Sequence, residues 1–291
     1  MKVEIFDERV CIIGEGPSSF GLDHSEFSWV DIIGSRVLTR NLVDGTSGEF
    51  ATEEHVGFAV RRRNGGYVLG TNSGPILRDP DGSSTLLFSL LDADPQTKSH
   101  AIRWNDAKVS PDGNLFLGTM GYEKLRGTST LFAIAPRDKH PKVILAELTI
   151  SNGMDWSDDG QTCYFIDSQW QAIRSFSVVD EKLVNPRNVI EVPAEEGAPD
   201  GMCLDAEGGI WVALWGGSEI RRYDANNGFV LTERIPVPAP FVTSMAFGGA
   251  DLKTLIITSA TDGLSNLSPE SGMTFFVQPG VQGRPSSTFA G

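Results

Sequence analysis

Short apolar runs of strand length recur along this chain, and each follows a turn. The six clearest runs are EFSWVDI, GGYVLGT, GNLFLGT, TCYFIDS, GIWVALW and TLIITSA. They align on Ser28, Val68, Phe116, Tyr164, Trp211 and Ile256, with 40 to 48 residues between successive positions. Helical periodicity is scarce, whereas runs rich in β-branched and aromatic residues, bounded by Gly, Asp, Asn and Pro, are typical of strands. The pattern predicts an all-β chain made of repeated units.

A repeat of about 40–50 residues made of short strands indicates a β-propeller, in which the units surround one axis. Weaker strand patterns between the six runs suit outer strands, so we expect six blades of about four strands. These blades would form a single domain over residues 1–291. The segments KVEIF and GMTFFVQ, near the two chain ends, are expected to pair in one blade, because such closure removes an exposed sheet edge.

Polar residues occupy the same phase of several units. Glu15, Arg103, Asn105, Asn152 and Asp200 each lie 11 to 13 residues before the aligned position of the next apolar run. Equivalent positions in a propeller are related by rotation about the axis. If this phase is the start of the innermost strand, these side chains converge at one mouth of the central channel.

Glu15, Asn152 and Asp200 together offer two carboxylates and one amide. Such an oxygen-only set suits a hard divalent cation such as Ca²⁺, Mg²⁺ or Mn²⁺. Two carboxylates that point at one channel mouth would repel each other unless a cation lay between them. The alternative is that each residue belongs to a turn, since Asn-Gly and Asp-Gly are common turn dipeptides. The shared phase favours the metal site.

Arg103 and Asn105 stand one residue apart in AIRWNDAKV. Alternate residues of a strand share a face, so both are expected to point into the channel while Trp104 points into the blade. There they would bind hydroxyl or carbonyl oxygens of a ligand; the alternative is a surface arginine followed by an Asn-Asp turn. His55 also falls in the site phase, with a packed histidine as its alternative, and Asp106 is expected to cap a loop.

The chain has 24 Lys and Arg against 38 Asp and Glu, a net charge of −14. This charge disfavours nucleic acid or an anionic membrane as partner and fits a neutral or cationic ligand, or a bound cation. The N-terminal segment has no apolar stretch typical of a signal peptide, and no apolar run reaches membrane-span length. Three cysteines without a CxxC spacing argue against a disulfide framework. We expect a cytoplasmic protein that is a monomer or a weak homo-oligomer.

Longer motifs add a resemblance to a known family. They are GEGPS, WVDI, RWNDAKVSPDGNLFLGTM, SNGMDWSDDG, PDGMCLDAEGGIWVALWGG and SMAFGGADLKTLIITSA. In this order they resemble the SMP-30/gluconolactonase/regucalcin (LRE) family, and the likeness continues to the C-terminal PGVQGRP. The resemblance implies a six-bladed propeller with one divalent metal in the channel. It also implies an activity on sugar lactones, which many members hydrolyse.

The resemblance implies that the two carboxylates and the amide described above are metal ligands. It further implies that Arg103 and Asn105 contact the substrate. Some members carry an acidic residue just after the GTM motif, whereas this chain has Gly121 and Tyr122 there, with Glu123 slightly later. We expect Glu123 to contact the substrate. The departure from the family pattern lies in the loop over the channel mouth, which is expected to determine substrate specificity.

The predicted function is hydrolysis of a sugar (aldono) lactone to the aldonic acid. The cation would polarise the lactone carbonyl and lower the pKa of a bound water, and Asp200 would act as general base. Ca²⁺ is favoured as the cation, with Mg²⁺, Mn²⁺ and Zn²⁺ as alternatives. Two other functions stay open: a related metal-dependent esterase or phosphotriesterase-like hydrolase, and a non-catalytic calcium-binding regulatory protein.

Overall fold

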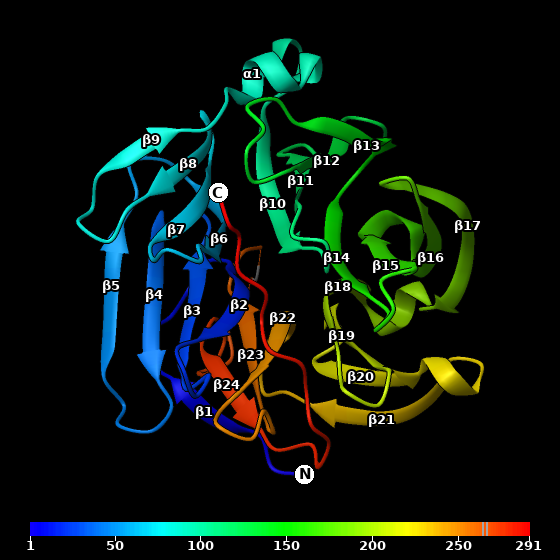
Figure 1. Cartoon of the computed structure of the whole chain (residues 1–291). Helices are drawn as coiled ribbons and strands as arrows, with labels where there is room; N and C mark the ends of the chain where they lie inside the picture. The colour runs from blue at the N-terminus through cyan, green and yellow to red at the C-terminus, as the bar shows by residue number, and fades with distance from the viewer. Residues whose placement is uncertain (264, 266) are drawn as a thin grey trace.

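The chain folds into small curled antiparallel sheets with few helices, so the all-β prediction is confirmed (Figure 1). The computed structural model describes residues 1–263, 265 and 267–291. Strands account for 54% of the chain and helices for 6%, which leaves packing between sheets to provide the core. In this described part, no helix combines the length and apolar character that crossing a membrane requires.

The described part of the chain contains four sheets of four strands each, paired in the order of the sequence. The first sheet has β2 (Gly14–Phe20), β3 (Glu26–Asp31), β4 (Arg36–Asn41) and β5 (Ser47–Ala51). The second has β6 (Val56–Arg61), β7 (Tyr67–Thr71), β8 (Gly74–Arg78) and β9 (Ser84–Leu86). The third has β10 (Ile102–Val109), β11 (Leu115–Gly121), β12 (Ser129–Ile134) and β13 (Lys142–Leu148). The fourth has β14 (Ser151–Trp156), β15 (Thr162–Asp167), β16 (Ala172–Val179) and β17 (Lys182–Glu191).

A fifth, eight-stranded sheet combines the last strands of the chain with the first. One half has β18 (Ala198–Leu204), β19 (Gly209–Trp215), β20 (Glu219–Asp224) and β21 (Val230–Pro236). The other half has β22 (Phe241–Gly248), β23 (Thr254–Ala260), β24 (Thr274–Val277) and β1 (Glu4–Asp7). The pairing of Trp215 with Phe241 joins the two halves.

Helical segments are short and lie in the connections. α1 (Leu90–Ala93) begins after Ser89, whose side chain accepts a hydrogen bond from the backbone N–H of Asp92. The 3-10 segments are Pro95–Lys98, Ser168–Trp170, Ala194–Glu196 and Ala225–Asn227. Several begin after an aspartate, such as Asp167, that caps the first turn, which satisfies backbone donors at low cost.

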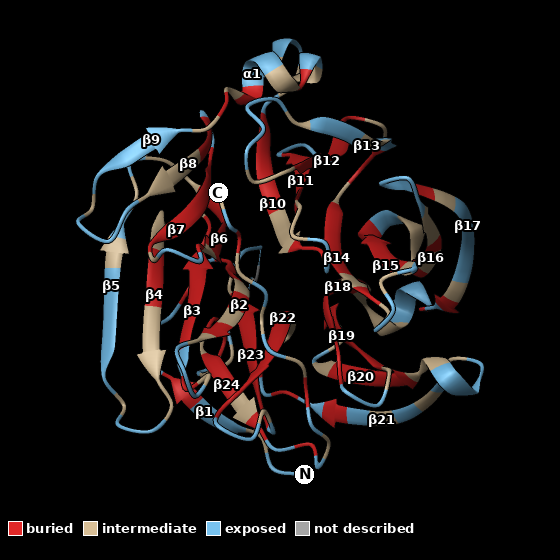
Figure 2. Ribbon diagram, viewed as in Figure 1, coloured by how far each residue is buried: buried red, intermediate tan, exposed pale blue. Residues whose placement is uncertain are grey.

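One strand of each four-stranded set belongs to a central ring. β2, β6, β10, β14, β18 and β22 pack side by side in this order, and β22 packs against β2. Figure 2 shows these strands as largely buried, while the outer strands such as β5, β9 and β17 are largely exposed. Glycines allow the close approach: a Cβ atom at Gly57 would overlap the backbone of Trp104, and one at Gly201 would overlap Ser244.

Aromatic side chains fill the space between neighbouring sheets. Trp104 is fully buried and packs edge-on against Phe58 of the neighbouring second sheet and against Phe132 of its own sheet. Tyr164 and Trp211, expected from the sequence to be packing residues, are both buried. The three cysteines, at positions 11, 163 and 203, are buried and free.

The two ends of the chain meet in one sheet, as the sequence predicts. Glu4 pairs with Phe276 and Ile5 with Phe275, so β1 runs antiparallel to β24. The N-terminal strand thereby covers an edge that would otherwise be exposed to other chains.

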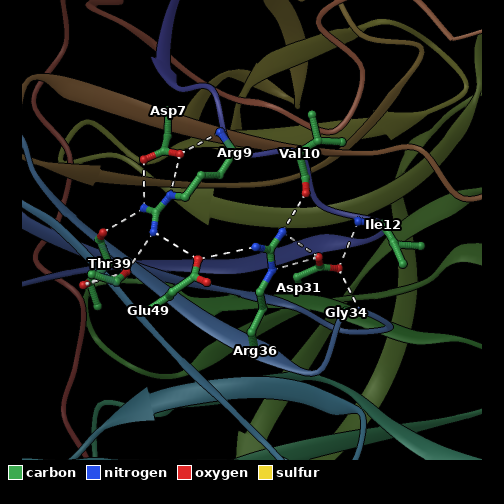
Figure 3. A network of polar contacts seen from close by, with 10 residues as sticks. Asp7, Arg9, Val10, Ile12, Asp31, Gly34, Arg36, Thr39 and Glu49 are labelled. Atoms are coloured by element: carbon green, nitrogen blue, oxygen red, sulfur yellow. Dashed lines mark hydrogen bonds and ion pairs between the residues drawn. The ribbon is translucent and has the colours of Figure 1, made fainter.

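Arg9 ties the segment after β1 to the first sheet (Figure 3). Its guanidinium donates two hydrogen bonds of 2.9 Å to the carboxylate of Asp7. It also donates one bond each, both of 2.9 Å, to the carbonyl oxygens of Thr39 and Gly48. The arginine thus links the eight-stranded sheet to β4 and β5.

Asp31 provides a second link across the same boundary (Figure 3). Its carboxylate accepts hydrogen bonds from the backbone N–H groups of Ile12 and Ile13, at 3.0 and 3.2 Å. Arg36 donates to the same carboxylate and, at 2.7 Å, to the carbonyl of Val10. The chain ends are therefore fixed by charged groups as well as by strand pairing.

Candidate metal centre and active site

Every strand of the central ring carries a β-bulge near its first residues. The register shifts fall at residues 15–18, 56–59, 104–107, 151–154, 199–202 and 242–244. A bulge leaves residues unpaired and re-aims their side chains. Asn105, Asn152 and Asp200 lie inside these bulges and Glu15 stands beside one. The Asn-Gly and Asp-Gly dipeptides therefore belong to strands, and the turn alternative is wrong for them.

The proposed metal ligands are all buried at this rim. Glu15, Asn152 and Asp200 expose 6%, 4% and 6% of their surface. One oxygen of Glu15 accepts a hydrogen bond from the N–H of Gly16 at 2.8 Å. Asn152 Nδ2 donates to Ser168 Oγ at 3.0 Å, while Asn152 Oδ1 has no hydrogen-bond partner in the described part of the chain. The amide is therefore oriented with an acceptor left free.

The carboxylates of Glu15 and Asp200 influence each other. Burial raises the pKa of Glu15 well above its usual range, and the charge of Asp200 raises it further. Burial, and then the charge of Asp106, raise the pKa of Asp200, whereas the Asn152 amide and Arg103 lower it. The three acids thus share a buried region in which positive charge is needed to keep them all ionised.

Arg103 and Asn105 point into the ring while Trp104 packs in the core, as alternation along a strand predicts. Arg103 Nη1 donates to Asn105 Oδ1 at 2.8 Å, and Asn105 Nδ2 donates to the carbonyl of Ser151 at 2.9 Å. Both amide atoms of Asn105 are therefore engaged within the protein. In this geometry Asn105 orients Arg103 and connects β10 to β14.

Asp106 was expected to cap a loop, and this expectation is wrong. It lies inside β10, in the same bulge as Asn105. Burial raises its pKa to about 6, although Lys108 acts against the shift, and its charge acts on both Glu15 and Asp200. The sequence contains the relevant signal, because Asp106 immediately follows a residue in the site phase.

Tyr122, at the end of β11, forms part of the rim next to Arg103. Its hydroxyl lies 2.7 Å from His55 Nδ1 and accepts a hydrogen bond from Asn72 Nδ2 at 3.3 Å. The Arg103 guanidinium carbon lies 5.9 Å from the centre of the tyrosine ring. His55 therefore lies at the rim, where it contacts Tyr122. Glu123, which is expected to contact the substrate, is an exposed residue of the following turn.

Lys124, two residues after Tyr122 in the same turn, reaches Trp215 at the end of β19. Its ammonium nitrogen lies 5.9 Å from the centre of the Trp215 ring. Trp215 is stacked on Phe241, with 4.3 Å between the ring centres and 11° between the planes. Lys124 also lowers the pKa of Asp200 by its charge. The sequence pattern does not predict a role at the rim for Lys124, Trp215 or Phe241, because none of them lies 11 to 13 residues before an aligned apolar run.

The residues at this rim fit a hard cation. The described residues contain no group of three or more His, Cys, Asp or Glu side chains that could hold a metal ion. The proposed set has only two such side chains and takes its third oxygen from an amide. The free Oδ1 of buried Asn152 and the mutual repulsion of Glu15 and Asp200 are both features that a divalent cation would satisfy.

A separate cavity of about 350 Å³ lies farther along the ring strands. Lys108 and Asp155 line it and form a 2.9 Å ion pair. Residues 284–287 of the C-terminal segment line it too, and Arg284 contacts Asp158 at 2.7 Å. Of the predicted site residues none lines this cavity, whereas Asp106 does. The channel therefore has two chemically different ends. This cavity lies at one end, and the proposed oxygen ligands lie at the other.

The described strands form an all-β ring with polar side chains at one rim. Comparison with known proteins identifies proteins of the same class. Residues 13–261 match the sequence model of the SMP-30/Gluconolactonase/LRE-like region, so the chain belongs to this family. Regucalcin of Sus scrofa is 31% identical over 303 residues, covering 100% of this chain and 99% of the relative. The family resemblance stated from the motifs is thereby confirmed.

Two solved structures of similar proteins cover nearly the whole chain. A luciferin-regenerating enzyme superposes with a TM-score of 0.90 at 25% identity, covering 99% of both chains. Regucalcin from Agrobacterium tumefaciens, described as a calcium-binding protein, has a TM-score of 0.89 at 26% identity, covering 99% of this chain and 97% of its own. The similar structures thus include one protein named for an enzymatic activity and one described as calcium-binding.

Proposed function

We propose that the protein is a divalent-metal-dependent lactonase that hydrolyses a sugar (aldono) lactone to the aldonic acid. Membership of a family whose name includes gluconolactonase supports this class of reaction. The observation that carries it is the group of Glu15, Asn152 and Asp200 at one rim, with Arg103 beside it. A hydrolase needs such a set of polar groups, whereas a purely structural ring does not.

Glu15, Asn152 and Asp200 would hold the cation, with Ca²⁺ favoured and Mg²⁺, Mn²⁺ or Zn²⁺ as alternatives. When bound, a divalent cation supplies Lewis-acid polarisation of the lactone carbonyl and makes a bound water more acidic. The oriented amide of Asn152 presents Oδ1 toward this position, because Ser168 holds its Nδ2. Ser168 in turn donates to the carbonyl of Pro199, which fixes the amide relative to β18.

Asp200 is the proposed general base. It accepts a proton from the attacking water and returns it to the ring oxygen that leaves when the C–O bond breaks. Arg103 lies close enough to lower the pKa of Asp200 by its charge, and it would orient the lactone by donating hydrogen bonds. Asn105 would position Arg103, and Tyr122 and Glu123 would contact the part of the substrate outside the channel.

We also propose that the strands form six blades of a single propeller domain. Dividing the eight-stranded sheet at the Trp215–Phe241 pair gives two sets of four strands, alongside the four separate sheets. The proposal includes a small-molecule partner, a monomeric or weakly associated state in the cytoplasm, and no nucleic-acid or membrane partner. The net charge of −14 supports the last point.

A hydrolysis screen tests the function directly. Chelated protein is mixed with a panel of sugar lactones and a pH indicator, and Ca²⁺, Mg²⁺, Mn²⁺ or Zn²⁺ is then added back. Acid release that depends on metal, and that Asp200→Asn abolishes, is the expected result. Metal binding without release from any lactone would contradict the proposal and favour a calcium-binding regulatory role. Release from aryl esters or phosphotriesters alone would favour the esterase-like alternative.

A further inference from the structure

We propose that the preferred lactone carries an anionic substituent, a carboxylate or a phosphate, which Arg103 and Lys124 bind. The inference rests on the proposed lactonase function and specifies its substrate class. It differs from the neutral or cationic ligand that the overall charge of the chain predicts. The argument depends on two positive side chains at the rim that no acid among the described residues pairs with.

Arg103 is buried and has no direct ionic partner. Only 5% of its surface is exposed, and in the described part of the chain no carboxylate oxygen lies within 4.0 Å of its nitrogens. Nη1 donates to Trp104 O and Asn105 Oδ1, both at 2.8 Å. The guanidinium has five N–H donors, so Nε and Nη2 still have hydrogens to donate. Neither is among the fully enclosed polar atoms without a partner, so both retain access to the mouth.

Other buried arginines of this chain are paired, which makes Arg103 an exception. Arg221 contacts Glu196 and Glu219, both at 2.6 Å, and Arg222 contacts Asp205 at 2.7 Å. With 38 acidic residues in the chain, an acid near a buried cation is easily available. A buried arginine costs stability unless it is paired, so an open guanidinium at a rim is suited to a ligand.

Lys124 adds a second positive charge, which acts on Asp200 by lowering its pKa. It lies in the exposed turn after β11 with a φ of 53°, a conformation that side chains other than glycine adopt rarely. Within residues 1–263, 265 and 267–291, its ammonium group has no carboxylate oxygen within 4.0 Å. The ammonium lies against Trp215 instead.

The nearby acids do not neutralise these cations through direct contact. Glu15, Asp200 and Asp262 act on Arg103 only as charges at longer range. In the proposed function, two of these acids bind the divalent cation and lose most of their negative potential. An anionic group on the lactone would then meet two positive side chains in addition to the cation: Lys124, which is exposed, and Arg103, whose burial makes the interaction stronger than in water.

Matched lactones isolate the substituent. D-Glucono-1,4-lactone and D-glucaro-1,4-lactone differ only at C6, where the second has a carboxylate. D-Glucono-1,5-lactone and its 6-phosphate provide the equivalent comparison for a phosphate. We expect kcat/KM to favour the anionic member of at least one pair by about tenfold, mainly through a lower KM. The pair that shows the preference identifies the anion.

Substitutions at the turn test the assignment of Lys124. Lys124→Gln should lower the preference for the anionic lactone about fivefold, the upper range for a solvent-exposed charge pair, and Lys124→Arg should restore it. Lys124→Glu should invert the preference. Lys139→Gln is the matched control, because it changes an exposed lysine in the connection between β12 and β13. It should leave the preference unchanged. Raising NaCl to 0.5 M should weaken the wild-type preference, because salt screens exposed charges.

The outcomes separate this inference from the proposed function. If neutral and anionic lactones are hydrolysed equally well, or if Lys124→Glu leaves their ratio unchanged, the inference is wrong and the lactonase function stands. If no lactone is hydrolysed, calorimetry on metal-loaded protein compares binding of gluconate with that of glucarate and 6-phosphogluconate. Tighter binding of glucarate or 6-phosphogluconate, lost in Lys124→Glu, would support the anion site without the activity, and equal binding would overturn it.

Discussion

Single side chains at the rim owe their direction to backbone irregularity. Asn152 and Asp200 lie where β14 and β18 depart from regular pairing, and both are almost fully buried. In a regular strand, a polar residue at an inner position would face an adjacent sheet. The bulge turns these side chains toward the axis, so the chemistry of the site depends on a few unpaired residues.

Asp200→Asn should abolish lactone hydrolysis, by about 10³-fold or more, because it removes both a proposed metal ligand and the proposed base. Steady-state rates with saturating cation measure the loss, and isothermal titration measures the affinity for the cation. Asp138→Asn changes an exposed aspartate away from the rim and serves as control. A variant at position 200 with near-normal kcat would remove Asp200 as the base.

Arg103→Ala should raise KM by about tenfold with a smaller change in kcat, since the side chain is proposed to orient the substrate. Arg187→Ala, which changes an exposed arginine on the outer strand β17, should leave both constants unchanged. Initial rates over a range of lactone concentrations separate the two constants. A loss confined to kcat would show that Arg103 acts on the reaction step and not on binding.

The sequence predicts the five polar residues of the inner phase because their positions repeat with the strands. It does not predict Asp106, Tyr122 or Lys124, for two physical reasons. The Asn-Asp dipeptide that ends at Asp106 is typical of a turn, but the same residues also fit a bulge inside a strand. Tyr122 and Lys124 reach the rim from a turn, and the direction of a turn follows from contacts such as Tyr122 with His55 that involve residues distant in the chain.

Adjacent ring strands approach so closely that glycine is required between them. Gly153 follows Asn152, and a Cβ at this position would lie 2.6 Å from the Met202 nitrogen and 2.7 Å from the carbonyl oxygen of Asp200. Since both neighbours are backbone atoms, they cannot move aside as a flexible side chain would. The distance between β14 and β18 therefore sets the distance between two proposed ligands.

Gly153→Ala should destabilise the fold by about 1–3 kcal/mol, as overpacking of a well-packed interior does, and should weaken cation binding as well. Thermal unfolding with and without the cation measures both effects. Gly48→Ala lies in the edge strand β5, where the nearest atom, Thr39 Oγ1 at 3.1 Å, belongs to a small side chain, and it is the matched control. Equal stability of the two variants would contradict the close-packing argument.

Strand positions were predictable because each apolar run is bounded by turn residues. The chain-end pairing was predictable too, because KVEIF and GMTFFVQ are strand-like and a closed ring needs an edge covered. The bulges were not, since they depend on contacts between neighbouring strands, such as that of Gly57 with Trp104, that no local pattern encodes.

The whole molecule should be more stable with cation bound. Binding at about 100 times Kd adds about 2.7 kcal/mol to the free energy of unfolding, if the cation binds only the folded state. In this protein the gain has a structural source, because the cation relieves the repulsion between Glu15 and Asp200. Calorimetry with excess Ca²⁺ and with chelator should show a higher Tm with the ion, and an unchanged Tm would argue against a cation at this rim.

The junction of the chain ends should contribute strongly to stability. Arg9→Ala removes four hydrogen bonds and leaves the buried carboxylate of Asp7 with Arg40, 3.5 Å away, as its remaining ionic partner. Because Arg9 is partly exposed, the expected loss is about 2 kcal/mol, which lowers Tm by about 3 °C in a chain of this length. Arg187→Ala should change Tm little, and an equal effect of the two variants would contradict a role for the junction.

The pairing of β1 with β24 also determines when the sheet can close during synthesis of the chain. Synthesis at about 5–20 residues per second takes about 15–60 s for a chain of this length. β1 leaves the ribosome well before Thr274–Val277, with which it pairs, have been synthesised. Until then the growing polypeptide has an open sheet edge that other nascent chains can join. A message truncated before codon 274 would therefore yield a product that never closes and is prone to aggregate.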